Sequence, residues 1–162
     1  MRKFIANDFG NYNNWRRTFG LITYSTYSIL NDFVNWNNVP EFDRSGASQL
    51  LKQIAFINLK KIPGASRSYD PVIAAAFQQH RQLILDQIEI INPEIIIGGH
   101  TLHHMYYALG IPGAQVNKDG CYFTDKRVYI EVDHPNQTQI SHEKYFENVV
   151  NPIKYWAENI RK

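Results

Sequence analysis

Polar residues able to recognise a small planar group follow apolar runs at three places in the sequence. Asn58 closes one run, the pair Gly98 and Gly99 with His100 closes a second, and His134 follows a third. An asparagine amide offers both a donor and an acceptor, and a histidine can donate a hydrogen bond to a developing anion. Adjacent glycines let a ligand approach the backbone. Together these segments predict one ligand site, provided that the fold brings them to the same edge of a sheet.

Each of the three segments also has a purely structural interpretation. Asn58 can stabilise a turn, as asparagine often does. Gly98 and Gly99 can form a tight connection between a strand and a helix. His134 can be a hydrogen-bonded structural residue, which Pro135 holds in an extended conformation. The residue types leave both interpretations open.

Three cations follow Asn58 within nine residues and predict contacts with phosphate groups: Lys60, Lys61 and Arg67. The chain as a whole has 17 Lys and Arg against 15 Asp and Glu, a formal net charge of +2 at pH 7. A balance so close to neutral predicts DNA binding that is weak and mostly electrostatic. The same three cations can also be solvated surface residues.

The histidines are too poorly matched with acidic residues in the sequence to predict a metal site. His100, His103 and His104 are close together, but the glutamate of a zinc-protease helix is missing between them. Cys121 is the only cysteine, which excludes a disulfide within the chain and a four-cysteine zinc or iron–sulfur site. We therefore expect neither a metal nor another cofactor.

The elements that must position these residues alternate between strands and helices. The sequence predicts a strand at 54–59 and then a helix that Asp70 caps, that begins at Pro71 and that Pro93 closes. It next predicts a strand at 94–97, a helix capped by Thr101 that runs to Leu109, paired strands at 121–124 and 127–132, and a last helix capped by Ser141. This order predicts a three-layer α/β/α fold with a short, mostly parallel sheet, in which ligands bind at the carboxyl ends of the strands.

We expect a single domain over residues 1–162, with an irregular or helical region at 1–47 and a recognisable core at 48–150. No apolar run approaches the ~18–20 residues of a membrane span, and the amino terminus lacks a secretory apolar core. A cytoplasmic protein without a membrane partner is the expectation.

Three motifs, taken in order, resemble the uracil-DNA glycosylase superfamily. They are the run 54–59 ending around Asn58, the run 90–99 ending in Gly98-Gly99, and the run 132–136, which contains His134-Pro135-Asn136. The longer segment from Asn58 to Gly64 resembles a poorly characterised bacterial branch of that superfamily.

The resemblance implies a function for the candidate residues. Asn58 would read the edge of a flipped uracil, which would lie against Gly98, Gly99, His100 and Asn136. His134 would stabilise the uracil that leaves as an anion. Lys60, Lys61 and Arg67 would hold the DNA backbone, and the enzyme would hydrolyse the N-glycosidic bond of an extruded nucleotide.

The sequence departs from this family at its beginning. The superfamily opens with a central strand and a motif whose polar residue activates the attacking water, and Asp8 is the one weak counterpart here. A missing first strand implies that another segment, or a second copy of the chain in a homo-oligomer, completes the sheet. The alternative function is an inactive relative that serves as a nucleic-acid-binding or protein-interaction module. An α/β-hydrolase is disfavoured because no Gly-x-Ser-x-Gly motif is present.

Overall fold

A computed structural model describes residues 15–61, 69–113, 115–116 and 121–162. The chain divides into two compact units, and neither is continuous in sequence. Unit 1 comprises Met1–Phe56 and Val132–Asn159, and unit 2 comprises Ile57–Glu131 and Ile160–Lys162. In the described part of the chain, no helix combines the length and the apolar character needed to cross a membrane.

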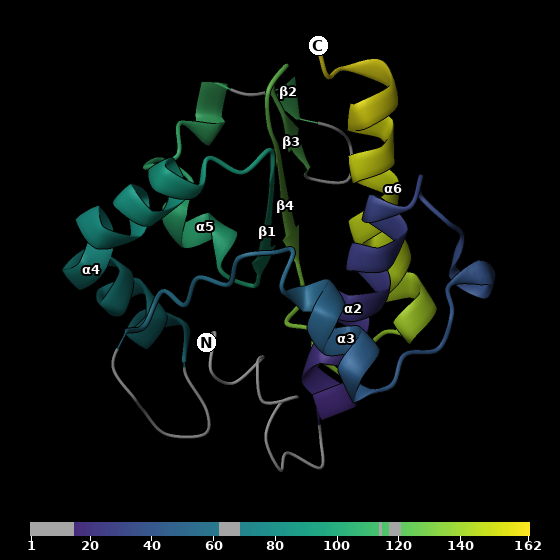
Figure 1. The fold of residues 1–162 in the computed structure, drawn as a ribbon. Coiled ribbons are helices and arrows are strands. Elements are labelled where there is room, and N and C mark those ends of the chain that lie inside the picture. The colour runs from purple at the N-terminus through teal and green to yellow at the C-terminus, as the bar shows by residue number, and fades with distance from the viewer. Residues whose placement is uncertain (1–14, 62–68, 114, 117–120) are drawn as a thin grey trace. The chain divides into compact units, whose positions relative to one another are not determined.

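Unit 1 is helical. It contains α2 (Trp15–Leu30), the 3-10 helix η1 (Trp36–Asn38), α3 (Arg44–Leu51) and α6 (His142–Asn159). Helix α2 packs against both α3 and α6, as Figure 1 shows. Asp43 caps α3 by accepting a 2.7 Å hydrogen bond from the Gly46 N–H. As predicted, Ser141 caps α6, since its Oγ accepts from the Lys144 N–H at 3.1 Å.

The apolar faces of these helices form the interior of unit 1. Ala47 and Leu51 of α3 are fully buried, and partly buried apolar side chains from α2 and from the segments flanking α3 pack around them. On α6 the buried residues recur at helical spacing: Tyr145, Phe146, Val149, Val150, Pro152, Ile153 and Trp156. The Trp36 and Phe146 rings meet at a centroid distance of 5.3 Å, which joins η1 to α6.

Unit 2 combines helices with a small sheet. Its elements are α4 (Asp70–Ile91), β1 (Ile95–Gly99), α5 (Leu102–Met105), η2 (Ile111–Gly113), β2 (Gln115–Val116), β3 (Tyr122–Phe123) and β4 (Val128–Val132), whose last residue falls in unit 1. The strand order is β1-β4-β3-β2. Buried side chains from α4, α5 and β4 form one cluster that includes Phe77, Ile84, Leu102, Met105 and Tyr129.

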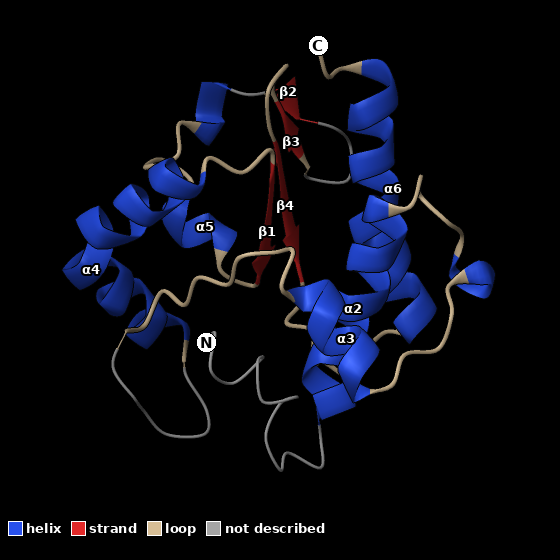
Figure 2. Ribbon diagram, viewed as in Figure 1, coloured by secondary structure: helices blue, strands red, loops and turns tan. Residues whose placement is uncertain are grey.

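The sheet is mixed, whereas the sequence predicted a mostly parallel one. Strands β2 and β3 pair antiparallel, and so do β3 and β4. The arrows of β1 and β4 point the same way in Figure 2. The antiparallel character follows from the short connections between β2, β3 and β4, since a parallel pair needs a crossover of a dozen or more residues. A small α/β fold is therefore present, and its three-layer arrangement stays a prediction.

The strand predicted at residues 54–59 is absent, and the segment has no regular secondary structure. Ile54 and Phe56 pack in the cluster of unit 1, whereas Ile57 and Leu59 pack in that of unit 2. The apolar run is continuous because it supplies two interiors, and not because a sheet covers it on both faces.

Candidate functional site

The turn between β1 and α5 is built on the close approach of a glycine to a helix. Gly98 is buried, and a Cβ added there would lie 2.6 Å from both the backbone nitrogen and the Cβ of Leu102. Only glycine fits at that distance, so the structural interpretation of Gly98 holds. His100 follows with φ +60°, a left-handed conformation that is uncommon for a residue with a side chain. Its side chain is exposed and lies beside that of His103, with ring centroids 5.4 Å apart.

A carboxylate from β4 holds the start of α5. Glu131 accepts hydrogen bonds from the backbone N–H groups of Thr101 and His103, each at 2.8 Å. One of its oxygens also lies 3.1 Å from Nδ1 of His103. Thr101 occupies the predicted N-cap position, but its side chain makes no capping hydrogen bond. Glu131 therefore supplies the acceptor that the sequence led us to expect from Thr101.

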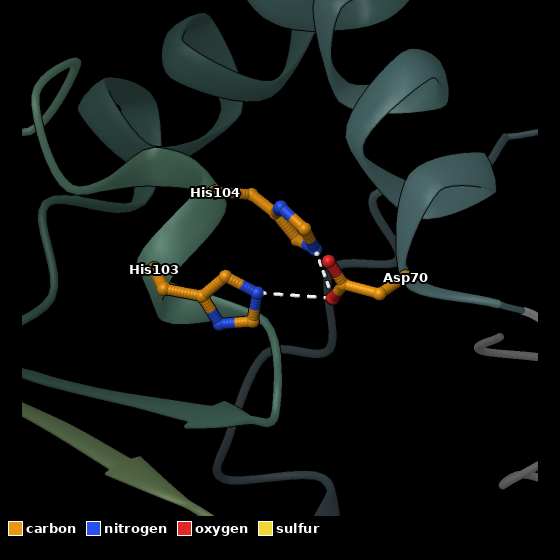
Figure 3. Close-up of side chains that lie close together, drawn as sticks. All are labelled: Asp70, His103 and His104. Carbon is orange, nitrogen blue, oxygen red and sulfur yellow. Dashed lines mark hydrogen bonds and ion pairs between the residues drawn. The ribbon is translucent and has the colours of Figure 1, made fainter.

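A second carboxylate, at the beginning of α4, meets two adjacent histidines. Oδ1 of Asp70 lies 3.0 Å from Nε2 of His103 and 3.1 Å from Nε2 of His104. Figure 3 shows both imidazoles reaching from α5 toward the same Asp70 oxygen. The sequence predicted Asp70 as the N-cap of α4, but Asp70 is the first residue of the helix. The cap is Tyr69, whose side chain makes no capping hydrogen bond. The Asp70 carboxylate is directed to the histidines instead.

The charges of these groups are coupled. The hydrogen bond from His103, supported by the positive potential of the nearby histidines, lowers the pKa of Asp70. Partial burial acts to lower the pKa of His103, but its hydrogen bonds to Asp70 and Glu131 outweigh burial and raise it. Burial and the neighbouring His103 lower the pKa of His104. The two carboxylates thus favour the protonated form of His103, whereas burial and the neighbouring His103 disfavour the protonated form of His104.

We refer to Asp70, His103, His104 and Glu131 as the histidine–carboxylate cluster. It lies entirely within unit 2. The sequence drew attention to the histidines but not to the two carboxylates. Asp70 precedes His103 by 33 positions and Glu131 follows it by 28, so no local motif links them. Only the packing of α4 and β4 around α5 brings the four residues together.

The Asn58 segment also belongs to unit 2. Asn58 is exposed and has no regular secondary structure, and both of its neighbours, Ile57 and Leu59, pack in the apolar cluster of unit 2. Lys61 donates a 2.8 Å hydrogen bond from Nζ to Oε1 of Gln87 on α4, and partial burial lowers its pKa. Lys60 is half-buried. Arg67 and Asp8, which were predicted to contact the DNA backbone and the attacking water, lie outside the described residues.

His134 follows β4, as predicted, and its ring is held by its own loop. The backbone N–H of Asn136 donates to Nδ1 of His134 at 3.1 Å, and the Gln137 N–H donates to the His134 carbonyl at 2.8 Å. Because Nδ1 accepts, Nε2 carries the hydrogen of the neutral ring. Partial desolvation lowers the pKa of His134, although its side chain is still reached by solvent. The result is a neutral imidazole whose Nε2–H is available as a donor.

The predicted site residues are distributed over both units. Asn58, Gly98, Gly99, His100, Lys60 and Lys61 belong to unit 2, whereas His134 and Asn136 belong to unit 1. A single cleft containing all of them stays a prediction.

No family model, curated protein or solved structure matches the chain. The likeness to the glycosylase superfamily therefore rests on the three sequence motifs alone.

Proposed function

We propose that this protein is uracil-DNA glycosylase-like: it binds a flipped nucleobase in DNA and excises it slowly. The observation that carries the proposal is the hydrogen bond from the Asn136 N–H to Nδ1 of His134. It leaves Nε2–H as a donor on a neutral ring, which is the group needed to stabilise a base that leaves as an anion. One preorganised donor of this kind can contribute about 10²–10³ in rate.

Asn58 is the proposed reader of the base. It is exposed and free of a regular element, and an amide can pair with both a carbonyl oxygen and a ring N–H of uracil. Lys60 and Lys61 come directly after Leu59 and are the proposed contacts to phosphate groups of the strand. These assignments follow the order of the family motifs and require Asn58 and His134 to reach the same base.

Water activation is the weak part of this function. In the glycosylase superfamily, the motif after the first strand supplies a polar residue that activates water. Asp8 is the only counterpart of that residue in this sequence. General-base assistance typically contributes ~10²–10⁴ in rate. A protein that keeps the leaving-group donor but lacks this assistance still binds the base and cleaves slowly.

A single-turnover assay on uracil-containing single- and double-stranded oligonucleotides tests the proposal. We expect slow excision that His134→Gln and Asn58→Ala lower further, together with weaker binding in Asn58→Ala. His142→Gln, an exposed histidine in the same unit as His134, is the matched control and should behave like the wild type. Fast cleavage abolished by Asp8→Asn would instead make Asp8 an efficient water-activating residue.

The alternative is a relative without catalysis that binds nucleic acid or another protein. Uracil-selective binding with no excision over hours would favour the nucleic-acid-binding form. DNA binding that is equally strong with and without uracil, and that is unchanged in His134→Gln and Asn58→Ala, would contradict the glycosylase-like proposal.

A further inference from the structure

Three potential ligand atoms converge in the histidine–carboxylate cluster. Oδ1 of Asp70, Nε2 of His103 and Nε2 of His104 lie close enough together to hold one metal ion, all within 4.8 Å of one another. Zinc bonds to nitrogen and oxygen are about 2.0–2.2 Å long, so tetrahedral ligand atoms stand roughly 3.3–3.5 Å apart. The two distances from Asp70, 3.0 and 3.1 Å, need to open by only a few tenths of an ångström.

His103 is oriented as metal-binding histidines usually are. Its Nδ1 faces Glu131 at 3.1 Å, which directs Nε2 toward Asp70. Histidine ligands almost always give their second nitrogen to a carboxylate, a carbonyl or water, and this partner fixes the ring. Glu131 is itself fixed by two backbone N–H groups, so the support does not depend on a mobile side chain.

His104 supplies an independent observation. Its Nε2 is buried and has no hydrogen-bond partner in the described residues, although Asp70 Oδ1 is only 3.1 Å away. The separation satisfies an ion pair, but the angles do not make a hydrogen bond. A buried polar atom without a partner costs free energy. A metal ion placed between the two atoms would accept the nitrogen lone pair and relieve this cost.

The cluster is also open on one side. The His104 side chain is 6% exposed, whereas those of Asp70 and His103 are 55% and 45% exposed. An ion can therefore reach the three atoms and keep water as a further ligand. Two imidazoles and one carboxylate with an open position suit borderline divalent ions such as Zn²⁺ and Co²⁺, whereas Mg²⁺ and Ca²⁺ prefer oxygen ligands.

We propose that Asp70, His103 and His104 bind one divalent transition-metal ion, with Glu131 as the positioning residue of His103. None of these four residues is a proposed base-binding residue, although His100, which is one, lies beside His103. The metal proposal does not depend on the proposed function. The competing explanation is an ion-pair network that only fastens α5 to α4.

Titration of the tag-free protein with Co²⁺ separates the two explanations. We expect visible absorption bands that saturate at one ion per chain and disappear on addition of Zn²⁺. Asp70→Asn, which preserves the size of the side chain, should weaken Zn²⁺ binding in calorimetry at least tenfold, as should His104→Gln. Glu131→Gln should weaken it by about 10–100-fold, as loss of an outer carboxylate does. His142→Gln, at the exposed start of α6, is the control and should bind as the wild type does.

Two results would overturn the proposal. One is a wild-type protein without saturable Co²⁺ bands, a result that needs no variant to fold. The other is equal binding by the wild type and Asp70→Asn, which would place the ion elsewhere. Circular dichroism of each variant shows whether lost binding reflects lost structure.

Discussion

Nδ1 of His103 lies 3.1 Å from a carboxylate oxygen of Glu131, a residue 28 positions further along the chain. The same carboxylate accepts the backbone N–H groups of Thr101 and His103. One acidic side chain on β4 thus fixes both the start of α5 and the rotation of an imidazole ring. The orientation of the His103 ring therefore depends on Glu131 of β4 as well as on α5, the helix that contains His103.

The Gly98 turn should not tolerate a side chain. Gly98→Ala places a Cβ 2.6 Å from backbone and side-chain atoms of Leu102, and we expect it to lower the free energy of unfolding by about 1–3 kcal/mol. Urea denaturation measures the change. Gly20→Ala is the control, because a Cβ there meets nothing within 4 Å in α2 and should leave stability unchanged or raise it by up to ~1 kcal/mol. A Gly98→Ala protein as stable as the wild type would mean that the turn is wider than described.

Neighbouring residues on α4 should differ sharply in their effect on stability. Ile84 is fully buried, so Ile84→Ala should cost about 2–5 kcal/mol through lost packing and the cavity that remains. Leu83 is 49% exposed, and Leu83→Ala should change the free energy of unfolding by less than about 0.5 kcal/mol. Thermal or urea unfolding of the pair tests which face of α4 is turned inward. Equal costs would contradict the helix orientation.

His134 should titrate below the ordinary histidine pKa of about 6.5, because partial burial disfavours its charged form. The unfolded chain then binds more protons than the folded one between the two pKa values. The contribution of His134 to the free energy of unfolding is therefore full above pH ~6.5. It decreases as the pH falls from there toward the pKa of His134 in the folded protein. His134→Gln should remove this part of the pH dependence. NMR of the ring C–H protons measures the midpoint, and a midpoint above 6.5 would contradict the prediction.

DNA binding, if it uses the predicted cations, should depend modestly on salt. Neutralisation of phosphates by Lys60, Lys61 and Arg67 gives a slope of log K against log salt of about −2 to −3. Lys60→Ala with Lys61→Ala should flatten it by about 1.5–2. Lys144→Ala with Lys154→Ala, two cations of α6 paired with Glu147 and Glu158, is the matched double control. Fluorescence anisotropy gives the slopes, and a slope unmoved by the first pair would exclude these lysines as contacts.

The parts of the fold that depend on local signals were predictable from the sequence. Helix α4 (Asp70–Ile91) was predicted from its apolar stripe and from Pro93 beyond its end, although it begins one residue before the predicted start. The β3–β4 hairpin was also predicted, and a turn with a 2.8 Å hydrogen bond from the Thr124 N–H to the Arg127 carbonyl closes it. The parts that depend on distant neighbours were not. The run 54–59 was predicted to be a strand because the sequence does not show that its side chains pack in two different apolar clusters. Asp70 was predicted to be a cap because the sequence does not show that His103 and His104 lie beside it.

The division of the chain into two interleaved units also fixes the order in which they can be completed during synthesis. Helix α2 ends at residue 30, but its partner α6 begins at residue 142, after nearly all of unit 2 has left the ribosome. Residues 57–131 form one uninterrupted stretch, so unit 2 can assemble before α6, a main packing partner of α2, has been made. Unit 1 must therefore wait, with part of the apolar surface of α2 uncovered, until α6 has been synthesised.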